Sequence, residues 1–335
     1  MRTTLIVALI SLIMIATALT LVTQTVGYFG NEAETLNSQK YQNYRYHFVL
    51  IAHATEENYW QQVLTGSAEL CRNEGIALEN YGPRFMNLKE LERFLEMAVL
   101  SSVDGILVSA PNDPLLIGLV DEAMAKHIPV VALGSRLETS QRLSFVGVAT
   151  DDLGFKTGQA LSQAIGNKSV RAALLVNSNF SPSGVQSYLR GFQKAIAVQP
   201  NLSIGLVVNS KGESISAEEQ TQSILKNHPE IQAIICSDPN DTLGVAKLVV
   251  DLNRVSQITI IGSGLTAEIA TYIRRGVIAG VLADDPGALG VQGISALLRL
   301  KEGRSAQEVY NMPLYLINAK NVDTFYRQFN LAESE

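Results

Sequence analysis

Short apolar runs rich in β-branched residues alternate with amphipathic stretches along the chain from Tyr46 onward. Runs of this kind indicate strands joined by helices, which is the β-α pattern of a parallel sheet. In the first half of the chain the predicted strands cover residues 47–52, 77–81, 105–110, 129–134 and 145–148. Helices are predicted between them at residues 59–73, 88–101 and 114–126. This first array therefore predicts one doubly wound sheet.

A second array of the same kind follows, with predicted strands at residues 171–177, 203–210, 233–237, 258–263 and 279–283. The chain has 335 residues, more than one hydrophobic core usually serves. Parallel strands need helices on both faces, and right-handed crossovers bring their carboxyl ends to one edge. The predicted fold class is therefore α/β, with two doubly wound parallel-sheet lobes joined by a hinge.

The apolar residues near the N-terminus form a separate segment, because no charged residue occurs between Thr3 and Val26. As a helix, residues 1–28 are long enough to cross a bilayer. Arg2 precedes the apolar stretch and Glu32 follows it, so the positive-inside rule places the rest of the chain outside the cytoplasm. Residues 16–18 also fit a signal-peptidase pattern. We therefore expect a transmembrane anchor or a signal peptide, followed by a polar tether at residues 29–45.

Polar and aromatic residues follow most of the predicted strands, where an open α/β sheet binds its ligands. Taken singly, each Asp, Asn or Ser there is best explained as a helix cap. Together they provide hydrogen-bond donors and acceptors, and the Tyr59–Trp60 pair adds aromatic surface. Hydroxyl groups and the C–H faces of a sugar need this combination. The pattern indicates that a small polar ligand binds between two facing sheet edges.

Composition and charge argue against a nucleic-acid-binding protein and against a disulfide. The net charge is −6, the isoelectric point is about 5.4, and no basic cluster occurs, which argues against a nucleic-acid partner. The two cysteines, Cys71 and Cys236, fall in different predicted lobes. We therefore expect two buried thiols and no disulfide.

The sequence contains no motif that would supply a catalytic or metal centre. Its four histidines have no metal-ligand spacing, and neither a phosphate-binding loop nor a nucleophile elbow occurs. The loop at residues 262–267 fits a loosened dinucleotide fingerprint, with Asp284 further along the chain. That loop lies late in the second array instead of opening a domain. A nicotinamide-dependent oxidoreductase is thus a minor alternative, and the prediction is a protein that is not an enzyme, with no cofactor and no metal.

Several motifs in order resemble the type I periplasmic sugar-binding protein family, the ribose- and galactose-binding kind. The matching segments are residues 58–63, 103–108 with Pro111, 128–131, 191–192, 228–234 and 241–244. The resemblance covers nearly all of residues 46–325 and implies three crossovers between the lobes. It implies a first lobe of residues 46–149 plus 286–311. The second lobe would hold residues 150–285 plus 312–335.

The resemblance also implies a set of ligand residues by position, which are Glu57, Tyr59, Trp60, Asp113, Arg136, Gln186, Asp238, Gly264 and Asp284. The sequence departs from the family at three places. The family often has Asn-Pro where Glu57-Asn58 stand, an arginine at Gln186 and an aspartate near Gly264. These changes leave the identity of the sugar open, because buried partners of hydroxyl groups decide specificity. Arg136 is the best single anchor.

These observations predict a solute-binding protein that captures a monosaccharide between its lobes outside the cytoplasm, for uptake by an ABC transporter. The alternative is a membrane-anchored sugar sensor that signals binding to a partner sensor kinase. Cleavage of the N-terminal segment would favour transport, and its retention would favour sensing. A sugar-responsive transcription regulator of related fold would need a helix-turn-helix before the first lobe, where the apolar segment stands.

Overall fold

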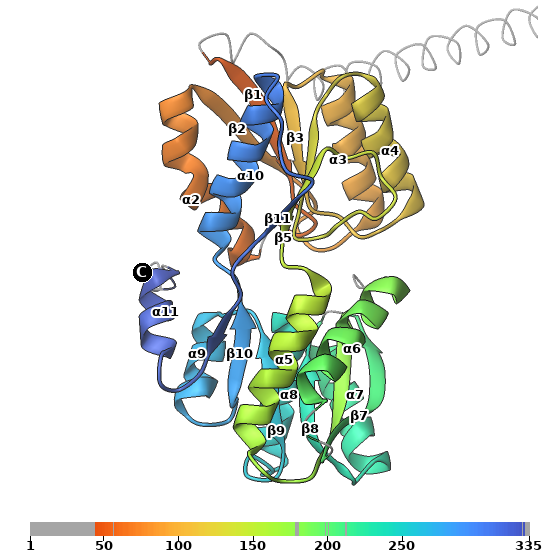
Figure 1. The fold of residues 1–335 in the computed structure, drawn as a ribbon, viewed down its shortest axis with the longest axis vertical. Coiled ribbons are helices and arrows are strands. Elements are labelled where there is room, and N and C mark those ends of the chain that lie inside the picture. The colour runs from red at the N-terminus through yellow and green to blue at the C-terminus, as the bar shows by residue number, and fades with distance from the viewer. Residues whose placement is uncertain are drawn as a thin grey trace, which may run out of the picture.

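A computed structural model describes residues 44–55, 57–177, 181–197, 199, 201–211, 213–329 and 331. The predicted N-terminal anchor or signal segment (1–28), and nearly all of the tether, lie outside these residues. Within the described part of the chain, every helix is too short or too polar to span a membrane. The chain forms two α/β lobes, one above the other in Figure 1.

The first lobe is built on a six-stranded sheet with the order β11-β5-β4-β3-β1-β2. Its strands are β1 (Tyr46–Ile51), β2 (Ile76–Tyr81), β3 (Gly105–Val108), β4 (Val130–Leu133), β5 (Ser144–Gly147) and β11 (Val309–Asn311). All of its pairs are parallel. Helices α3 (Leu88–Leu100) and α4 (Pro114–Ala125) cover one face, and α2 (Asn58–Glu74) and α10 (Pro286–Lys301) cover the other. Two apolar layers therefore enclose the sheet.

The second lobe repeats this plan with the sheet order β12-β10-β9-β8-β6-β7. Its strands are β6 (Val170–Asn177), β7 (Leu202–Ser210), β8 (Ile231–Cys236), β9 (Thr259–Ser263), β10 (Gly280–Ala283) and β12 (Tyr315–Ile317). One face packs on α7 (Ser214–Asn227), α8 (Pro239–Asp251), α9 (Ala267–Arg274) and α11 (Val322–Gln328). The other packs on α5 (Thr150–Ile165) and α6 (Pro182–Ile196).

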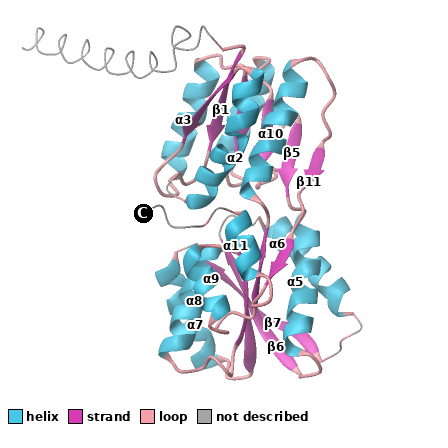
Figure 2. Ribbon diagram, turned by 90° about the vertical axis from the view of Figure 1, so that its left-hand side faces the viewer, coloured by secondary structure: helices cyan, strands magenta, loops and turns pink. Residues whose placement is uncertain are grey.

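The chain passes between the lobes three times, from β5 to α5, from β10 to α10 and from β11 to β12. In Figure 2 strands β5 and β11 point toward the second lobe. After β11 the chain keeps this direction into the second sheet, so β12 runs antiparallel to β10 while β11 runs parallel to β5. The carboxyl ends of the parallel strands in both sheets consequently face each other across the hinge.

The predicted architecture of two α/β sheets is confirmed, and each predicted strand has a counterpart whose ends differ by at most two residues. The sequence analysis missed β11 and β12, which are only three residues long and carry no clear alternation. The second sheet is therefore not wholly parallel, because β12 is an antiparallel edge strand. Both cysteines are free and buried, as expected.

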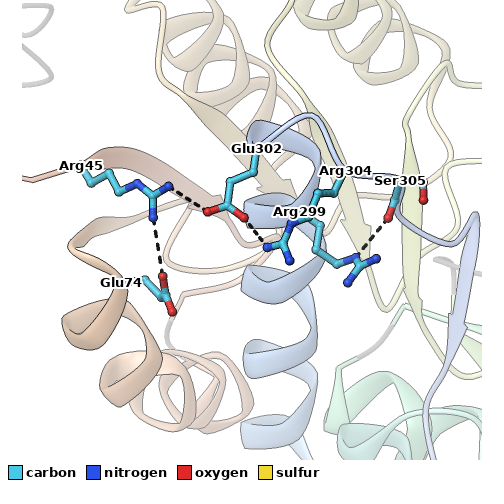
Figure 3. Close-up of polar contacts among 6 residues, drawn as sticks. All are labelled: Arg45, Glu74, Arg299, Glu302, Arg304 and Ser305. Carbon is cyan, nitrogen blue, oxygen red and sulfur yellow. Dashed lines mark hydrogen bonds and ion pairs between the residues drawn. The ribbon is translucent and has the colours of Figure 1, made fainter.

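A polar network fixes the start of β1 at the end of the first lobe remote from the hinge (Figure 3). The Arg45 guanidinium lies 3.8 Å from the Glu74 carboxylate at the end of α2 and 2.9 Å from Glu302, just after α10. Arg304 also pairs with Glu302. The Arg299 Nε donates to the Ser305 carbonyl over 3.1 Å. Each exposed ion pair of this kind contributes little to stability. The network therefore mainly orients the start of β1 and the residues that follow α10.

Candidate functional site

A cavity of about 350 Å³ lies between the two facing sheet edges. Residues of both lobes line it, including the segments after β1, β3 and β4 in the first lobe and those after β6, β8, β9 and β10 in the second. All but two of the predicted ligand residues line this cavity, namely Glu57, Tyr59, Trp60, Arg136, Asp238, Gly264 and Asp284. The volume suits a ligand the size of a monosaccharide or somewhat larger.

The remaining two predicted residues, Asp113 and Gln186, do not line the cavity. The Asp113 carboxylate caps α4 and accepts hydrogen bonds from the backbone N–H groups of Leu115 and Leu116 at 2.9 and 3.4 Å. Gln186 is an exposed residue of α6. For Asp113 the ordinary helix-cap explanation accounts for the residue, and Asn112 lines the cavity beside it.

An aromatic cluster stands after β1 on the first lobe's edge. The Trp60 ring is almost fully buried and meets the Tyr59 and His53 rings edge-on, with centroid distances of 5.2 and 5.4 Å. The His53 Nδ1 lies 3.1 Å from the Ser109 hydroxyl. Burial lowers the pKa of His53 to about 4, so this imidazole is neutral at pH 7. The cluster offers apolar surface and no positive charge.

Arg136 supplies the positive charge on this edge, after strand β4. The turn that leads to it uses Gly134 at a φ of 69°, a conformation that side chains rarely adopt. The Arg136 guanidinium lies over the Phe145 ring, 5.4 Å from its centroid. Among the described residues no carboxylate forms an ion pair with it, and it therefore remains available to a ligand.

The second lobe presents a carboxylate that is already held in place. The Asp238 side chain caps α8 by accepting from the Asn240 and Asp241 N–H groups at 2.8 and 3.4 Å. It also accepts from the Asn177 amide at 2.9 Å. Burial raises the pKa of Asp238 in spite of these bonds, which lower it. A ligand therefore meets an oriented acceptor here.

Glu57 differs from Asp238, although both carboxyl groups line the cavity. Although 42% of the Glu57 side chain is exposed, its desolvation in the cleft, and secondly the nearby Asp238 charge, raise its pKa to about 7 from the ordinary value of 4.5. The Trp60 indole N–H lies beside the Glu57 carboxyl and opposes this rise in pKa. Among the described residues, no acceptor is close enough and well enough aligned to form a hydrogen bond with that N–H. The nearest basic group is the His53 ring, whose Nε2 is 3.9 Å away. Glu57 thus faces a second carboxylate without a cation to balance it.

Besides the bond from the Asn311 amide of β11 to the Asp152 carboxylate of α5 at the crossovers, two side-chain hydrogen bonds beside the cavity join the lobes in the described part of the chain. The Tyr59 hydroxyl of α2 donates to the Asp284 carboxylate, at the end of β10, over 2.8 Å. At the cavity mouth, the Ser183 hydroxyl of α6 donates to the Glu138 carboxylate over 2.6 Å. Burial raises the pKa of Asp284, and the Tyr59 hydrogen bond partly offsets this. Both contacts hold the two edges close together.

A model of the family described as "Periplasmic binding protein domain" matches residues 48–305. The chain belongs to this family. Specifically, it is a type I periplasmic binding protein, with ribose-, allose- and galactose-binding homologues. The family consists of binding proteins and not of enzymes, as the sequence analysis predicted.

Several known proteins are similar to this family member over most of their length. GanP, a glucose-galactose binding protein from Geobacillus stearothermophilus, is 29% identical with a TM-score of 0.77, covering 82% of this chain and 98% of GanP. The ribose import binding protein RbsB of Escherichia coli (strain K12) is 23% identical over 68% of this chain and 76% of RbsB. A structure described as the XylFII-LytSN complex has a similar fold, with a TM-score of 0.72 and 24% identity, covering 82% of this chain and 98% of that one.

The geometry of this binding protein also explains the glycine-rich loop after β9. A Cβ on Gly262 would lie 2.3 Å from the Thr242 side chain, and one on Gly264 would lie 2.5 Å from Pro239. Gly264 also has a φ of 72°. These glycines permit the loop to pack closely on the start of α8. The fingerprint therefore has a structural explanation that involves no dinucleotide.

Several cavity-lining residues of this binding protein escaped the sequence analysis, which are Ser109, Glu138, Thr150, Ser181 and Leu314. Ser109 directly follows β3, but the predicted strand extended to residue 110 and so placed Ser109 inside the strand instead of after it. Thr150 and Leu314 lie at the crossovers, where no local pattern marks them. Within the described residues, no group of three or more His, Cys, Asp or Glu side chains is placed to hold a metal ion.

Proposed function

We propose that this protein captures a monosaccharide between its lobes, outside the cytoplasm, and delivers it to an ABC permease. The observation that carries the proposal is the interlobe cavity, where oriented carboxylates and aromatic rings meet a guanidinium that forms no ion pair with any described residue. Hydroxyl groups of a sugar both donate and accept hydrogen bonds, so Arg136 and Asp238 suit them from opposite sides. Tyr59 and Trp60 suit the C–H surface of the ring.

The relatives support a sugar as the ligand class. GanP is a glucose-galactose binding protein, and RbsB is a ribose import binding protein. A structure described as a solute-binding protein bound with α-D-tagatopyranose shares the fold, with a TM-score of 0.78 and 18% identity. The family assignment and the N-terminal apolar segment together support a location outside the cytoplasm.

The proposed mechanism is closure about the hinge. With the lobes apart, both polar edges contact water, and a bound sugar stabilises the closed state because only there does it contact both edges. The bonds from Tyr59 to Asp284 and from Ser183 to Glu138 form part of the closed surface. The closed outline, which spans both lobes, is what a permease would recognise.

Isothermal titration calorimetry with a panel of pentoses and hexoses tests this proposal. The full-length chain is kept in a detergent without a sugar headgroup, so that the detergent does not compete for the cavity. At least one monosaccharide should bind with one-to-one stoichiometry. Gln186→Ala serves as the control, because Gln186 lies outside the cavity. Absence of binding by every sugar in the panel would remove the proposal.

A second candidate function is sugar sensing through a membrane partner. Two observations favour it: the apolar stretch continues to Val26, past the possible cleavage pattern at residues 16–18, and the XylFII protein of the same fold is found in a complex with LytSN. Retention of the segment would hold the binding protein beside a sensor kinase at high effective concentration. Mass spectrometry of the mature N-terminus separates the two functions. An intact segment and sugar-dependent cross-linking to a kinase would support sensing, and cleavage with cross-linking to a permease would support transport.

A further inference from the structure

The charged side chains that line the cavity are mainly acidic. Among the described residues that line it there are four carboxylates, from Glu57, Glu138, Asp238 and Asp284, and one lysine or arginine, Arg136. Two of these carboxylates are occupied by bonds that join the lobes, since Asp284 accepts from Tyr59 and Glu138 accepts from Ser183. The carboxylates that remain for a ligand are therefore those of Glu57 and Asp238.

Glu57 and Asp238 both line the cavity, Glu57 from the first lobe and Asp238 from the second. The Asp238 charge contributes to the raised pKa of Glu57. Asp238 is stabilised by the start of α8 and by Asn177. Glu57 has no such support among the described residues, and its nearest basic neighbour, His53, is neutral at pH 7. A group that enters between them meets two acceptors with no protein cation.

The cation of the cavity stands apart from this acidic pair. Arg136 follows β4 and Glu57 follows β1, and β3 lies between these two strands in the sheet. The two residues therefore enter the cavity from different segments of the first lobe. Glu138, two residues after Arg136, also lines the cavity, but its carboxylate is bonded to Ser183.

We infer that the sugar carries a positively charged amino group, which lies between Glu57 and Asp238 while its hydroxyl groups reach toward Arg136. This inference rests on the proposed function and names the substrate class of the same site. An ammonium group donates three hydrogen bonds and neutralises the two carboxylates, whereas a neutral hydroxyl leaves their repulsion in place. The Tyr59 and Trp60 rings beside Glu57 add a further attraction for a cation.

Calorimetry at pH 7 with matched sugars tests the inference on the full-length chain. The probes are glucosamine and galactosamine, their neutral parents glucose and galactose, and the N-acetyl derivatives, in which the nitrogen is uncharged. One of the amino sugars should bind at least tenfold more tightly than its parent and its N-acetyl form. Parents that bind as tightly as the amino sugars would overturn the inference and leave the proposed function standing. Absence of binding by all six sugars would overturn the inference, and the proposed function falls with it only if every pentose and hexose of the wider panel also fails to bind.

The variant Glu57→Gln assigns the preference to its residue. It keeps the shape of the side chain and removes the charge, so the tenfold preference should fall to less than threefold. Glu69→Gln is the matched control on the same helix, and it should retain the preference because Glu69 is exposed and does not line the cavity. Loss of the preference in the control alone, or its survival in Glu57→Gln, would contradict the assignment.

Proton release gives a second measurement that a merely structural role of Glu57 would not change. An ammonium beside Glu57 lowers the pKa of that carboxyl from about 7, so binding at pH 7 should release protons. Calorimetry in two buffers of different ionisation enthalpy measures this release. The other titratable groups lining the cavity are His53, Tyr59, Arg136, Glu138, Asp238 and Asp284. Comparison with Glu57→Gln subtracts their contribution, and an equal release from both proteins would contradict the inference.

Discussion

The strands follow corresponding orders in the two sheets. The side chains at the two facing edges nevertheless differ in how they are hydrogen-bonded. On the second lobe Asp238 is held by α8 and Asn177, and the Ser263 hydroxyl donates to the Cys236 carbonyl at 2.9 Å. On the first lobe neither Glu57 nor Arg136 has a charged partner that balances it among the described residues. The second lobe thus presents an oriented surface, and the first presents charges that a ligand can satisfy. The comparison suggests that the first lobe sets much of the specificity.

The two lobes are more alike in the way their crossover helices are fastened. Helix α10 packs on α2 in the first lobe, and α5 packs on α6 in the second. Both pairs meet at glycines, since a Cβ on Gly66 would lie 2.3 Å from the Gly287 Cα and one on Gly191 would lie 1.9 Å from the Asp151 carbonyl oxygen. Each helix that leaves the hinge is therefore pressed directly against its own lobe.

The largest expected effect comes from filling these helix contacts. Gly66→Val and Gly191→Val should each lower the free energy of unfolding by about 3 kcal/mol or more, because the new side chain meets backbone atoms that cannot move aside. Chemical denaturation followed by circular dichroism measures the change.

Gly118→Ala is the control for this test. Gly118 lies in α4 with open space around its Cβ position, so the alanine should stabilise the protein slightly, by about 0.5 to 1 kcal/mol. Wild-type stability in both valine variants would contradict the close packing of the crossover helices.

The second effect concerns the charge on the first lobe's edge. Arg136→Ala should weaken sugar binding by about 2 kcal/mol, or roughly thirtyfold, because a ligand oxygen loses its charged hydrogen bonds in a buried site. Arg190→Ala is the control, since Arg190 is an exposed residue whose guanidinium bonds to Ser187. Calorimetry of both variants with the same sugar measures the difference. An unchanged affinity in Arg136→Ala would remove its role as anchor.

The third effect is a pH dependence that compares one carboxyl from each lobe. The pKa of Glu57 is raised to about 7, and burial likewise raises the pKa of Asp241 to about 7, where Ser210 donates to one carboxyl oxygen at 2.6 Å. The other Asp241 oxygen is buried without a partner. Each of these two carboxyl groups therefore contributes stability that is lost as pH rises from about 4 to about 7, whereas His53, with its pKa lowered to about 4, contributes the opposite slope.

Denaturation at several pH values checks this sign. Glu57→Gln and Asp241→Asn should each flatten part of the slope, since neither amide titrates. Bound amino sugar should reduce only the Glu57 part, because Asp241 is fully buried and does not line the cavity. A slope from pH 5 to pH 7 that is the same in the wild type and in both variants would contradict both assignments.

The smallest effect is expected where a predicted ligand residue lies outside the cavity. Asp113→Ala should cost about 1 kcal/mol of stability through the lost cap of α4, with no change in sugar affinity. Gln186→Ala should change neither quantity, because its side chain is exposed on α6. A large loss of affinity in either variant would show that the ligand extends beyond the cavity.

The sequence predicted the parts of this molecule that follow from periodic patterns. The strands of both arrays carry dense apolar runs, and the rule that ligands bind after parallel strands led to residues such as Arg136 and Asp238. The same rule pointed to Asp113, which the structure places outside the cavity as the cap of α4, because a helix cap and a ligand residue have the same sequence signature.

Residues at the crossovers are beyond such patterns. Thr150 and Leu314 line the cavity only because the chain passes between the lobes beside it. The bond between Tyr59 and Asp284 joins residues 225 positions apart, and no local pattern indicates it. The pairing state of Glu57 is likewise a property of the assembled cleft. The sequence therefore could not predict how the sheet edge of the first lobe is placed against that of the second.

Trp60 allows the most direct test of ligand capture between the lobes, because it is the only tryptophan and it lines the cavity. The fluorescence of the full-length protein is followed during titration with a sugar whose binding calorimetry has established. The account predicts a saturable change in Trp60 emission with the same dissociation constant as calorimetry gives. Sugar binding by calorimetry with no change in Trp60 emission would place the ligand elsewhere and contradict the account.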